Sequence, residues 1–195
     1  MRGRRAVILN VAESHLALHG YLGVSLEAIA AEIGISKPAL YYHFPEGKEQ
    51  LFVEIAHRSL QRVRDGLEQA IGEHESGARR LVAATRWFME QGERGHPVNE
   101  MRDVAKFASE QRAEGLSREF YRAIYEPIYA VVGEAVESGE FRRGAPELMS
   151  WSYLGLVSGM LDVRGVSGYG GADLGFGEKA DEVARIFLEG ALARG

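Results

Sequence analysis

The sequence predicts an all-α protein with two helical parts. Apolar residues recur at the three- and four-residue spacing of amphipathic helices, and no stretch alternates with the period of two that strands show. Serine and glycine stand where the first helices would begin and end, so those helices should be short. From residue 48 onward the patterned segments are longer. We therefore expect a compact three-helix domain at residues 1–47 and a larger helical domain at residues 48–195.

The N-terminal three helices are predicted from their caps and stops. The first should run from about Arg4 to Leu18, with Gly20 as its stop. Ser25 and Ser36 each precede a short helix, and each hydroxyl can accept a hydrogen bond from a free backbone N–H group of the first turn. Pro38 is tolerated there because first-turn N–H groups lack helical partners. The third helix should therefore be only about two turns long.

Longer amphipathic helices are expected in the rest of the chain. One begins at Lys48 and keeps its apolar spacing as far as Ile71. The others are expected at residues 78–91, 100–112, 118–137, 146–163 and 178–193. Pro127 should kink or divide the 118–137 segment. The glycine-rich stretch from Gly165 to Gly177 predicts a mobile connection before the last helix.

Composition restricts the class of protein. The 195 residues contain no cysteine, which excludes disulfides, thiolate metal sites and a cysteine nucleophile. The apolar stretches fall short of the roughly 20 residues that cross a bilayer, so we expect a cytoplasmic protein with no membrane partner. The net charge is -5, but acidic and basic residues balance within residues 1–58. An anion-binding surface must therefore lie at the N-terminal end.

Residues 35–44, ISKPALYYHF, place three aromatic side chains in a helix too short to bury them all. Leu40 and Phe44 are four residues apart and would hold this helix on the core. The remaining side chains then project outward or along the edge: Lys37, Pro38, Ala39, Tyr41, Tyr42 and His43. Tyrosine hydroxyls, lysine and histidine can contact phosphate, and tyrosine rings pack on sugars or thymine methyl groups. The pattern predicts a helix-turn-helix whose second helix enters the DNA major groove.

Further cations flank this motif. Lys48 adds an ammonium at the start of the long helix, where free N–H groups favour anions. Arg2, Arg4 and Arg5 could form an arm along the duplex backbone or in the minor groove. Tyr21 is expected to pack under the motif. The alternative, that the aromatic residues pack within an ordinary helix bundle, is disfavoured because helices this short and doubly capped are rare as plain core elements.

At these residues the chain resembles the TetR family of bacterial transcriptional repressors. The likeness covers about Ile8 to Phe52, through IL..A, Gly20-Tyr21, SLEAIAAEIGIS, LYYHF and KEQLF. It implies that DNA is lined by Ser25, Lys37, Ala39, Tyr41, Tyr42, His43 and Lys48. With Arg4, Arg5, Ser36 and Pro38 they make up the candidate DNA-binding set. Two departures stand out: Val24 replaces a common threonine, and PEGKEQL is one residue longer than the frequent P-x-K-x-x-L, which would displace Lys48.

The larger domain has the composition of a ligand cage. Aromatic residues supply apolar walls with polar tips, as small-molecule pockets require. The candidate ligand contacts are Trp87, Phe88, Phe107, Phe120, Tyr121, Tyr125, Trp151 and Tyr153. Core packing is the alternative for each of them. The resemblance implies a small effector that releases DNA, and the aromatic content suggests a bulky apolar or acyl-bearing one; we expect no cofactor and no metal.

Residues 146–163 are apolar on most sides, so a helix there must be covered twice. Together with residues 178–193 they are expected to form an intersubunit four-helix bundle in a homodimer. Gly155 and Gly159 would let the backbones approach closely. A two-fold dimer presents two reading helices about one DNA turn apart, roughly 34 Å, and so predicts a palindromic operator.

Other functional classes find less support. His15 and His19 share helical ligand spacing, but no third ligand stands at a matching position. GYGGAD resembles a dinucleotide fingerprint only superficially, because Asp173 replaces the third glycine. We therefore expect no catalytic residues and no enzyme activity. The remaining alternative is a helical dimeric interaction module without DNA binding, which salt-dependent duplex binding would distinguish from a ligand-responsive repressor.

Overall fold

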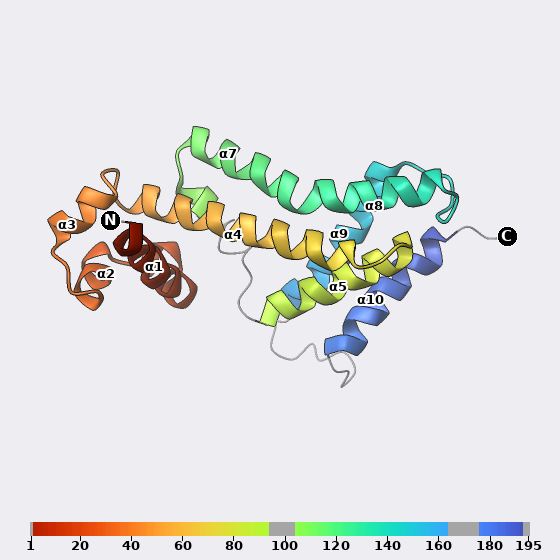
Figure 1. Ribbon diagram of the computed structural model, residues 1–195, viewed down its shortest axis with the longest axis horizontal. Helices are drawn as coiled ribbons and strands as arrows, with labels where there is room; N and C mark the ends of the chain where they lie inside the picture. The colour runs from red at the N-terminus through yellow and green to blue at the C-terminus, as the bar shows by residue number, and fades with distance from the viewer. Residues whose placement is uncertain (1, 94–103, 164–175, 193–195) are drawn as a thin grey trace. The chain divides into compact units, whose positions relative to one another are not determined.

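The computed structural model describes residues 2–93, 104–163 and 176–192. In these ranges the chain is helical, as predicted, with one isolated bridge between Phe141 and Leu192. It divides into two compact units, residues 1–62 with 95–119 (unit 1) and residues 63–94 with 120–195 (unit 2). The elements in Figure 1 are α1 (Arg2–Gly23), α2 (Leu26–Glu32), α3 (Lys37–His43), α4 (Lys48–Gly72), α5 (Gly77–Glu93), α7 (Glu110–Phe120), η1 (Tyr121–Tyr125), α8 (Glu126–Glu137), α9 (Pro146–Val163) and α10 (Phe176–Ala191). The functional boundary at residue 47 stays a prediction.

The core of unit 1 forms from the apolar faces that the sequence predicted. Ile8, Ala12 and Leu16 of α1 are buried, and so are Ile29 of α2 and Phe52 of α4. In Figure 1, α1, α2 and α3 gather at the N-terminal end of α4. Gly20 has φ 63° and ψ 172°, which are not helical values, so the regular first helix stops there as predicted. A short helical segment follows across this kink and extends α1 to Gly23.

The prediction of separate helices at 100–112 and 118–137 was wrong in its described part. The helical turn at residues 104–107 stops at Ala108, and α7 begins at Glu110. Between them the backbone N–H of Ser109 donates to the Glu49 carboxylate at 2.8 Å. A bond between residues so far apart along the chain fixes this break, and helical periodicity carries no sign of it. Residues 100–103 lie outside the described residues.

From Glu110 to Glu137 the chain is one continuous helical run with a π-helical turn, η1, inside it. The N–H of Glu126 bonds to the Tyr121 carbonyl, five residues back. Pro127 follows at once, in the first turn of α8, where its missing N–H group is least costly. Pro127 therefore does interrupt the regular α-helix, as predicted, through a local widening of the helix.

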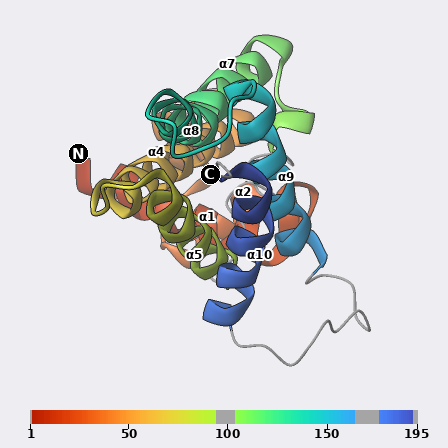
Figure 2. The ribbon, with the colours of Figure 1, turned by 90° about the vertical axis from the view of Figure 1, so that its right-hand side faces the viewer.

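In unit 2 the helices α5, α8, α9 and α10 pack on one another as a bundle. Figure 2 shows α5, α9 and α10 grouped together, and α5 packs on both α8 and α10. The Glu140 carboxylate accepts hydrogen bonds from the Gly77 and Ala78 N–H groups at 2.8 and 2.9 Å, which caps the start of α5. The predicted range of α9 is confirmed, and α10 begins two residues before its predicted start. The predicted glycine-rich connection falls mainly on residues 164–175, outside the described residues.

None of the helices in the described ranges combines the length and the apolar character needed to cross a bilayer.

Close packing of α4 on α5 in unit 2 depends on Gly66. A Cβ atom placed on Gly66 would lie 2.7 Å from Cζ2 of Trp87, whereas one on Gly133 of α8 would meet nothing within 4 Å. We expect Gly66→Ala to lower the free energy of unfolding by about 1–2 kcal/mol, because the overpacking exceeds the gain in helix propensity. Urea unfolding at fixed protein concentration measures the change. Gly133→Ala is the control and should be neutral or stabilising; equal effects of the two changes would contradict the packing argument.

Candidate functional site

The helix-turn-helix of unit 1 is held by the two predicted serine caps. Ser25 Oγ accepts the N–H of Ala28 at 3.0 Å, and Ser36 Oγ accepts that of Ala39 at 3.3 Å. Between α2 and α3 the chain turns through Gly34, whose φ of 67° lies in the left-handed region that favours glycine. The N–H of Ile35 then bonds back to the Ala30 carbonyl at 2.9 Å. Short-range contacts thus fix the start of α3.

Helix α3 buries one side and exposes the other. Leu40 and Phe44 are fully buried, whereas Tyr42 is 69% exposed and Tyr41 39%. Lys37 and Pro38 are also exposed, and Ala39 and His43 are half-buried. The predicted projecting residues therefore lie on one surface of unit 1. A polar-aromatic face on a helix that is anchored from behind can contact a phosphate backbone and base edges.

An ion pair lies on this exposed face. The Lys37 ammonium bonds to the Glu27 carboxylate, which ties α3 to α2. The hydrogen bond between them lowers the pKa of Glu27 and raises that of Lys37, so both groups are charged at neutral pH. The Lys37 ammonium also lies 6.0 Å from the centre of the Tyr41 ring. The pair positions a cation beside the exposed tyrosines.

The flanking cations differ in what they contact. Arg4 is exposed. Arg5 instead bonds to the Glu54 carboxylate and to the His43 carbonyl oxygen, inside unit 1. The Lys48 ammonium donates to the Val24 carbonyl at 2.7 Å and lies 4.8 Å over the Tyr21 ring. Burial lowers the pKa of Lys48.

Tyr21, which was expected to pack under the motif, packs within unit 1 on α4 and on the 104–107 turn. Its ring meets Phe52 edge-on at 5.5 Å and stacks on Phe107 at 4.9 Å between ring centres. Phe107, a predicted ligand contact, therefore lies in unit 1 beside the helix-turn-helix. The other predicted ligand residues belong to α5, the end of α7, η1 and α9.

The structure brings three of the predicted ligand residues together. Tyr125 is buried and contacts the rings of Tyr121 at 4.7 Å and Trp151 at 4.6 Å. Tyr129 also stacks on Tyr125, with 5.8 Å between the ring centres. Tyr121 and Trp151 are about half exposed, so this cluster reaches the surface of unit 2.

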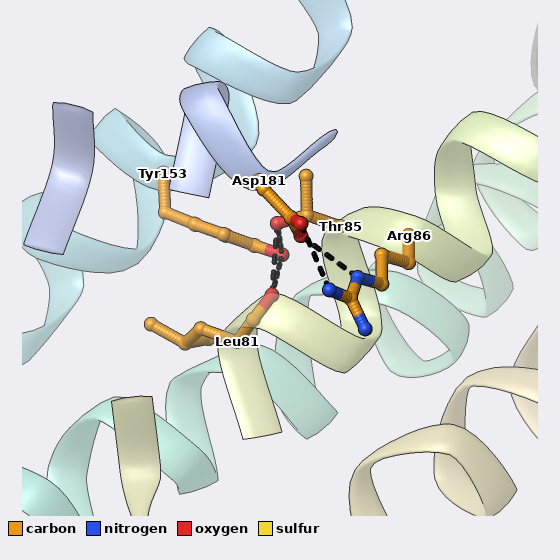
Figure 3. Close-up of polar contacts among 5 residues, drawn as sticks. All are labelled: Leu81, Thr85, Arg86, Tyr153 and Asp181. Carbon is orange, nitrogen blue, oxygen red and sulfur yellow. Dashed lines mark hydrogen bonds and ion pairs between the residues drawn. The ribbon is translucent and has the colours of Figure 1, made fainter. Parts of the chain in front are cut away.

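Tyr153 belongs to the packed interior instead. It is fully buried, and its hydroxyl oxygen lies 2.8 Å from that of Thr85 and 3.0 Å from the Leu81 carbonyl oxygen (Figure 3). Burial raises the pKa of the Tyr153 hydroxyl above its ordinary value. Beside this network Arg86 and Asp181 form a two-pronged ion pair at 2.7 and 2.8 Å that joins α5 to α10. The polar tip of Tyr153 is thus satisfied within the protein.

A cleft of about 390 Å³ opens on unit 2 between the end of α4 and α5. Among the predicted ligand residues only Trp87 lines it, and Phe88 beside it is buried. The other lining residues are Ala70, Glu73, His74, Arg79, Val82, Ala83, Arg86 and Glu90. The members from α5 recur at helical spacing, a signal that could have indicated one continuous face of this helix. The lining of the cleft combines apolar side chains with cationic and anionic groups.

Within the described ranges no group of three or more histidine, cysteine, aspartate or glutamate side chains is arranged to hold a metal ion. His15 lies 2.6 Å from the Glu32 carboxylate, and the rings of His15 and His19 are 5.9 Å apart. This contact joins α1 to α2.

Two short capped helices joined by a glycine turn, the second of them exposed on one side, form a helix-turn-helix motif. The predicted resemblance to the TetR family of transcriptional regulators is confirmed for this N-terminal part of the chain. Residues 8–55 match the family described as bacterial regulatory proteins, tetR family. Over 60 residues, 31% of this chain and 32% of the relative, the sequence is 43% identical to the HTH-type transcriptional regulator LmrA of Bacillus subtilis (strain 168). The match thus spans about a third of that relative's length.

Solved structures extend the likeness to nearly the whole chain. The TetR family transcriptional regulator PfmR from Thermus thermophilus is 26% identical, with a TM-score of 0.72 over 94% of this chain and 97% of that one. AibR, solved in complex with isovaleryl coenzyme A and operator DNA, has the same fold at 23% identity and a TM-score of 0.75, with the same coverage of the two chains. The predicted architecture, an N-terminal helix-turn-helix and a larger C-terminal helical part, is therefore confirmed.

Proposed function

We propose that this protein is a ligand-responsive transcriptional repressor of the cytoplasm. It binds a palindromic operator as a homodimer and releases it when a small acyl-bearing or bulky apolar effector binds. The observation that carries the proposal is the exposed polar-aromatic side of α3, whose opposite side is anchored by the fully buried Leu40 and Phe44. Nothing in an ordinary bundle requires such a surface.

The DNA-contacting surface consists of α3 and the groups around it. Tyr42, Tyr41 and Lys37 are its centre, because they are the exposed aromatic and cationic groups of the reading helix. Ser25 and Ser36 stand at the N-terminal ends of α2 and α3, where free N–H groups attract phosphate. The remaining proposed members are Arg4, Pro38, Ala39, His43 and Lys48, whereas Arg5, which the sequence also suggested, bonds to His43 and Glu54 inside unit 1.

The double change Lys37→Ala with Tyr42→Ala should weaken duplex binding by about 10- to 100-fold, since a phosphate contact and a ring contact are lost. The plot of log affinity against log salt should become shallower by roughly one unit. Anisotropy titrations at several salt concentrations measure both, with a duplex selected from a random library by the wild-type chain.

The matched control is Tyr121→Ala with Arg122→Ala, an exposed tyrosine and arginine of unit 2. It should leave duplex affinity in the absence of effector unchanged. Wild-type protein that shows no salt-dependent duplex binding would instead identify the helical interaction module without DNA binding.

The dimer contact is proposed at α9 and α10. Leu148, Trp151 and Leu156 of α9 and Ile186 of α10 are exposed apolar residues. Gly155 and Gly159 also belong to α9, and there is open space next to both, because a Cβ atom on either would meet nothing within 4 Å. An apolar helix face with such gaps suits close approach of a second copy about a two-fold axis.

Leu156→Arg should shift the protein toward monomer by at least tenfold in dissociation constant, since it places an unpaired charge in an apolar contact. Sedimentation equilibrium at micromolar concentration measures the shift. Ser117→Arg adds the same charge on exposed α7 and should leave assembly unchanged. A Leu156→Arg protein that stays as dimeric as the wild type would rule out this contact.

We propose that the effector binds in unit 2 at the cleft beside Trp87. Ala70, Val82 and Ala83 offer apolar surface, and Arg79 and His74 offer hydrogen-bond donors for an anionic group. AibR supports the acyl-bearing class, because its fold is the same and its structure contains isovaleryl coenzyme A. Helix α4 contributes residues to both units, so it is the proposed route from effector to DNA. A ligand shifts the equilibrium only by its preference for the released state, several kcal/mol for a full switch.

Acyl coenzyme A thioesters should release the selected duplex, and free coenzyme A should do so less well, because the acyl chain supplies the apolar contact. Arg79→Ala should raise the concentration for half-release about tenfold, since an anionic group loses a charge-assisted hydrogen bond. Arg143→Ala, an exposed arginine of the same unit, is the control. If no thioester changes duplex affinity, this effector class is wrong.

A further inference from the structure

Arg5 contacts three residues of unit 1, at the end of α3 and on α4. Its Nη1 donates to the backbone carbonyl of His43 at 2.5 Å. Nε and Nη2 donate to the two carboxylate oxygens of Glu54, the first at 3.2 Å. The guanidinium carbon lies 4.4 Å from the centre of the Phe44 ring. One side chain of α1 thus joins the end of α3 to α4.

The end of α3 is where such a contact matters. His43 is the last residue of the helix and Phe44 is its C-cap. The last carbonyls of a helix have no partner inside it, so the bond from Arg5 satisfies one of them. A cation at this end is also favoured by the helix dipole. The planar guanidinium can bond the carbonyl and both carboxylate oxygens at once, which a lysine ammonium cannot do with the same geometry.

Arg4, the preceding residue, gives a direct comparison. Arg4 and Arg5 carry the same charge on the same helix. Arg4 is exposed, whereas the side chain of Arg5 is 37% exposed and directed toward Glu54, His43 and Phe44. Contacts that differ this much between neighbours indicate different roles.

We propose that Arg5 is a positioning residue for DNA reading: it holds the C-terminal end of α3 on α1 and α4, and it acts on DNA through this helix. Arg4 supplies the cation that faces the duplex. This role rests on the proposed function, since α3 is the proposed reading helix. It assigns Arg5 to the internal support of the surface, a role that the resemblance did not indicate.

Amide hydrogen exchange and duplex binding together test the role of Arg5. The variants are Arg5→Ala, Arg5→Lys and, as matched control, Arg4→Ala. Exchange is followed at the amides of Leu40 and Phe44, which bond to the Ser36 and Leu40 carbonyls, with α10 of unit 2 as internal reference. Binding to the selected duplex is measured over a range of salt concentrations.

Both Arg5 variants should speed exchange at Leu40 and Phe44 by about tenfold or more relative to α10, because charge-assisted bonds are lost. They should weaken duplex binding by a similar factor with an unchanged salt slope. Arg4→Ala should leave exchange unchanged and reduce the slope by roughly one. The role is overturned if Arg5→Lys behaves as wild type in both measurements, or if Arg5→Ala reduces the slope without faster exchange.

Glu54→Gln removes the carboxylate partner but keeps the charge of Arg5. It tests the positioning role if Arg5→Ala does not fold. Faster exchange at Phe44 in this variant supports the role, and wild-type exchange overturns it. The exchange measurement contains no DNA. If the wild type did not bind the duplex, the proposed function would be refuted. The exchange rates would still show whether Arg5 holds the end of α3.

Discussion

Unit 1 depends on the anchoring of one seven-residue helix. Isolated helices shorter than about 12–15 residues are marginal in water, so α3 exists because its surroundings hold it. Leu40 and Phe44 are fully buried, and burial of such a side chain contributes about 1.5–3 kcal/mol. The Ser36 cap holds one end, and Arg5 contacts the other. All of these contacts lie behind or at the ends of the helix, so its front surface is left for a partner.

Much of unit 1 could be predicted because its signals are local. The serine caps, the glycine turn and the buried faces of α1 and α2 depend on residues within one or two helical turns of each other. The contacts of Arg5 with His43 and of Lys48 with Val24 join residues 38 and 24 positions apart, and no local pattern encodes them. The same limit explains the misplaced start of α7, which a bond from Ser109 to Glu49 determines. The exposure of Tyr42 could be predicted from the sequence. The hydrogen bonds that Arg5 and Lys48 make inside unit 1 could not.

In unit 2 the surroundings of an aromatic side chain depend more on its position in the fold than on its residue type. Tyr153, Tyr125 and Trp151 were grouped by their chemistry, yet the first is sealed in a hydroxyl network, the second lies in a ring cluster and the third is half exposed. Each belongs to a helical segment, and the neighbouring helix that covers it decides its burial. Composition therefore indicated a domain suited to ligands, but it could not distinguish the residues that line a pocket from those that pack in the core. Of the eight predicted ligand residues, Trp87 alone lines the cleft.

The π turn between α7 and α8 sets the direction in which the side chains of α8 face. An α-helix advances about 100° per residue, so the residues after a wider turn face a direction that a regular helix of the same length would not give them. Leu116 before the turn and Ile128 after it are both fully buried, one in each compact unit. Pro127 cannot donate the hydrogen bond that a regular helix would require of it. The wider turn takes up one residue more than a regular helix would, so a one-residue deletion in η1 that restored α-helical bonding would leave the side chains of α8 facing their present neighbours.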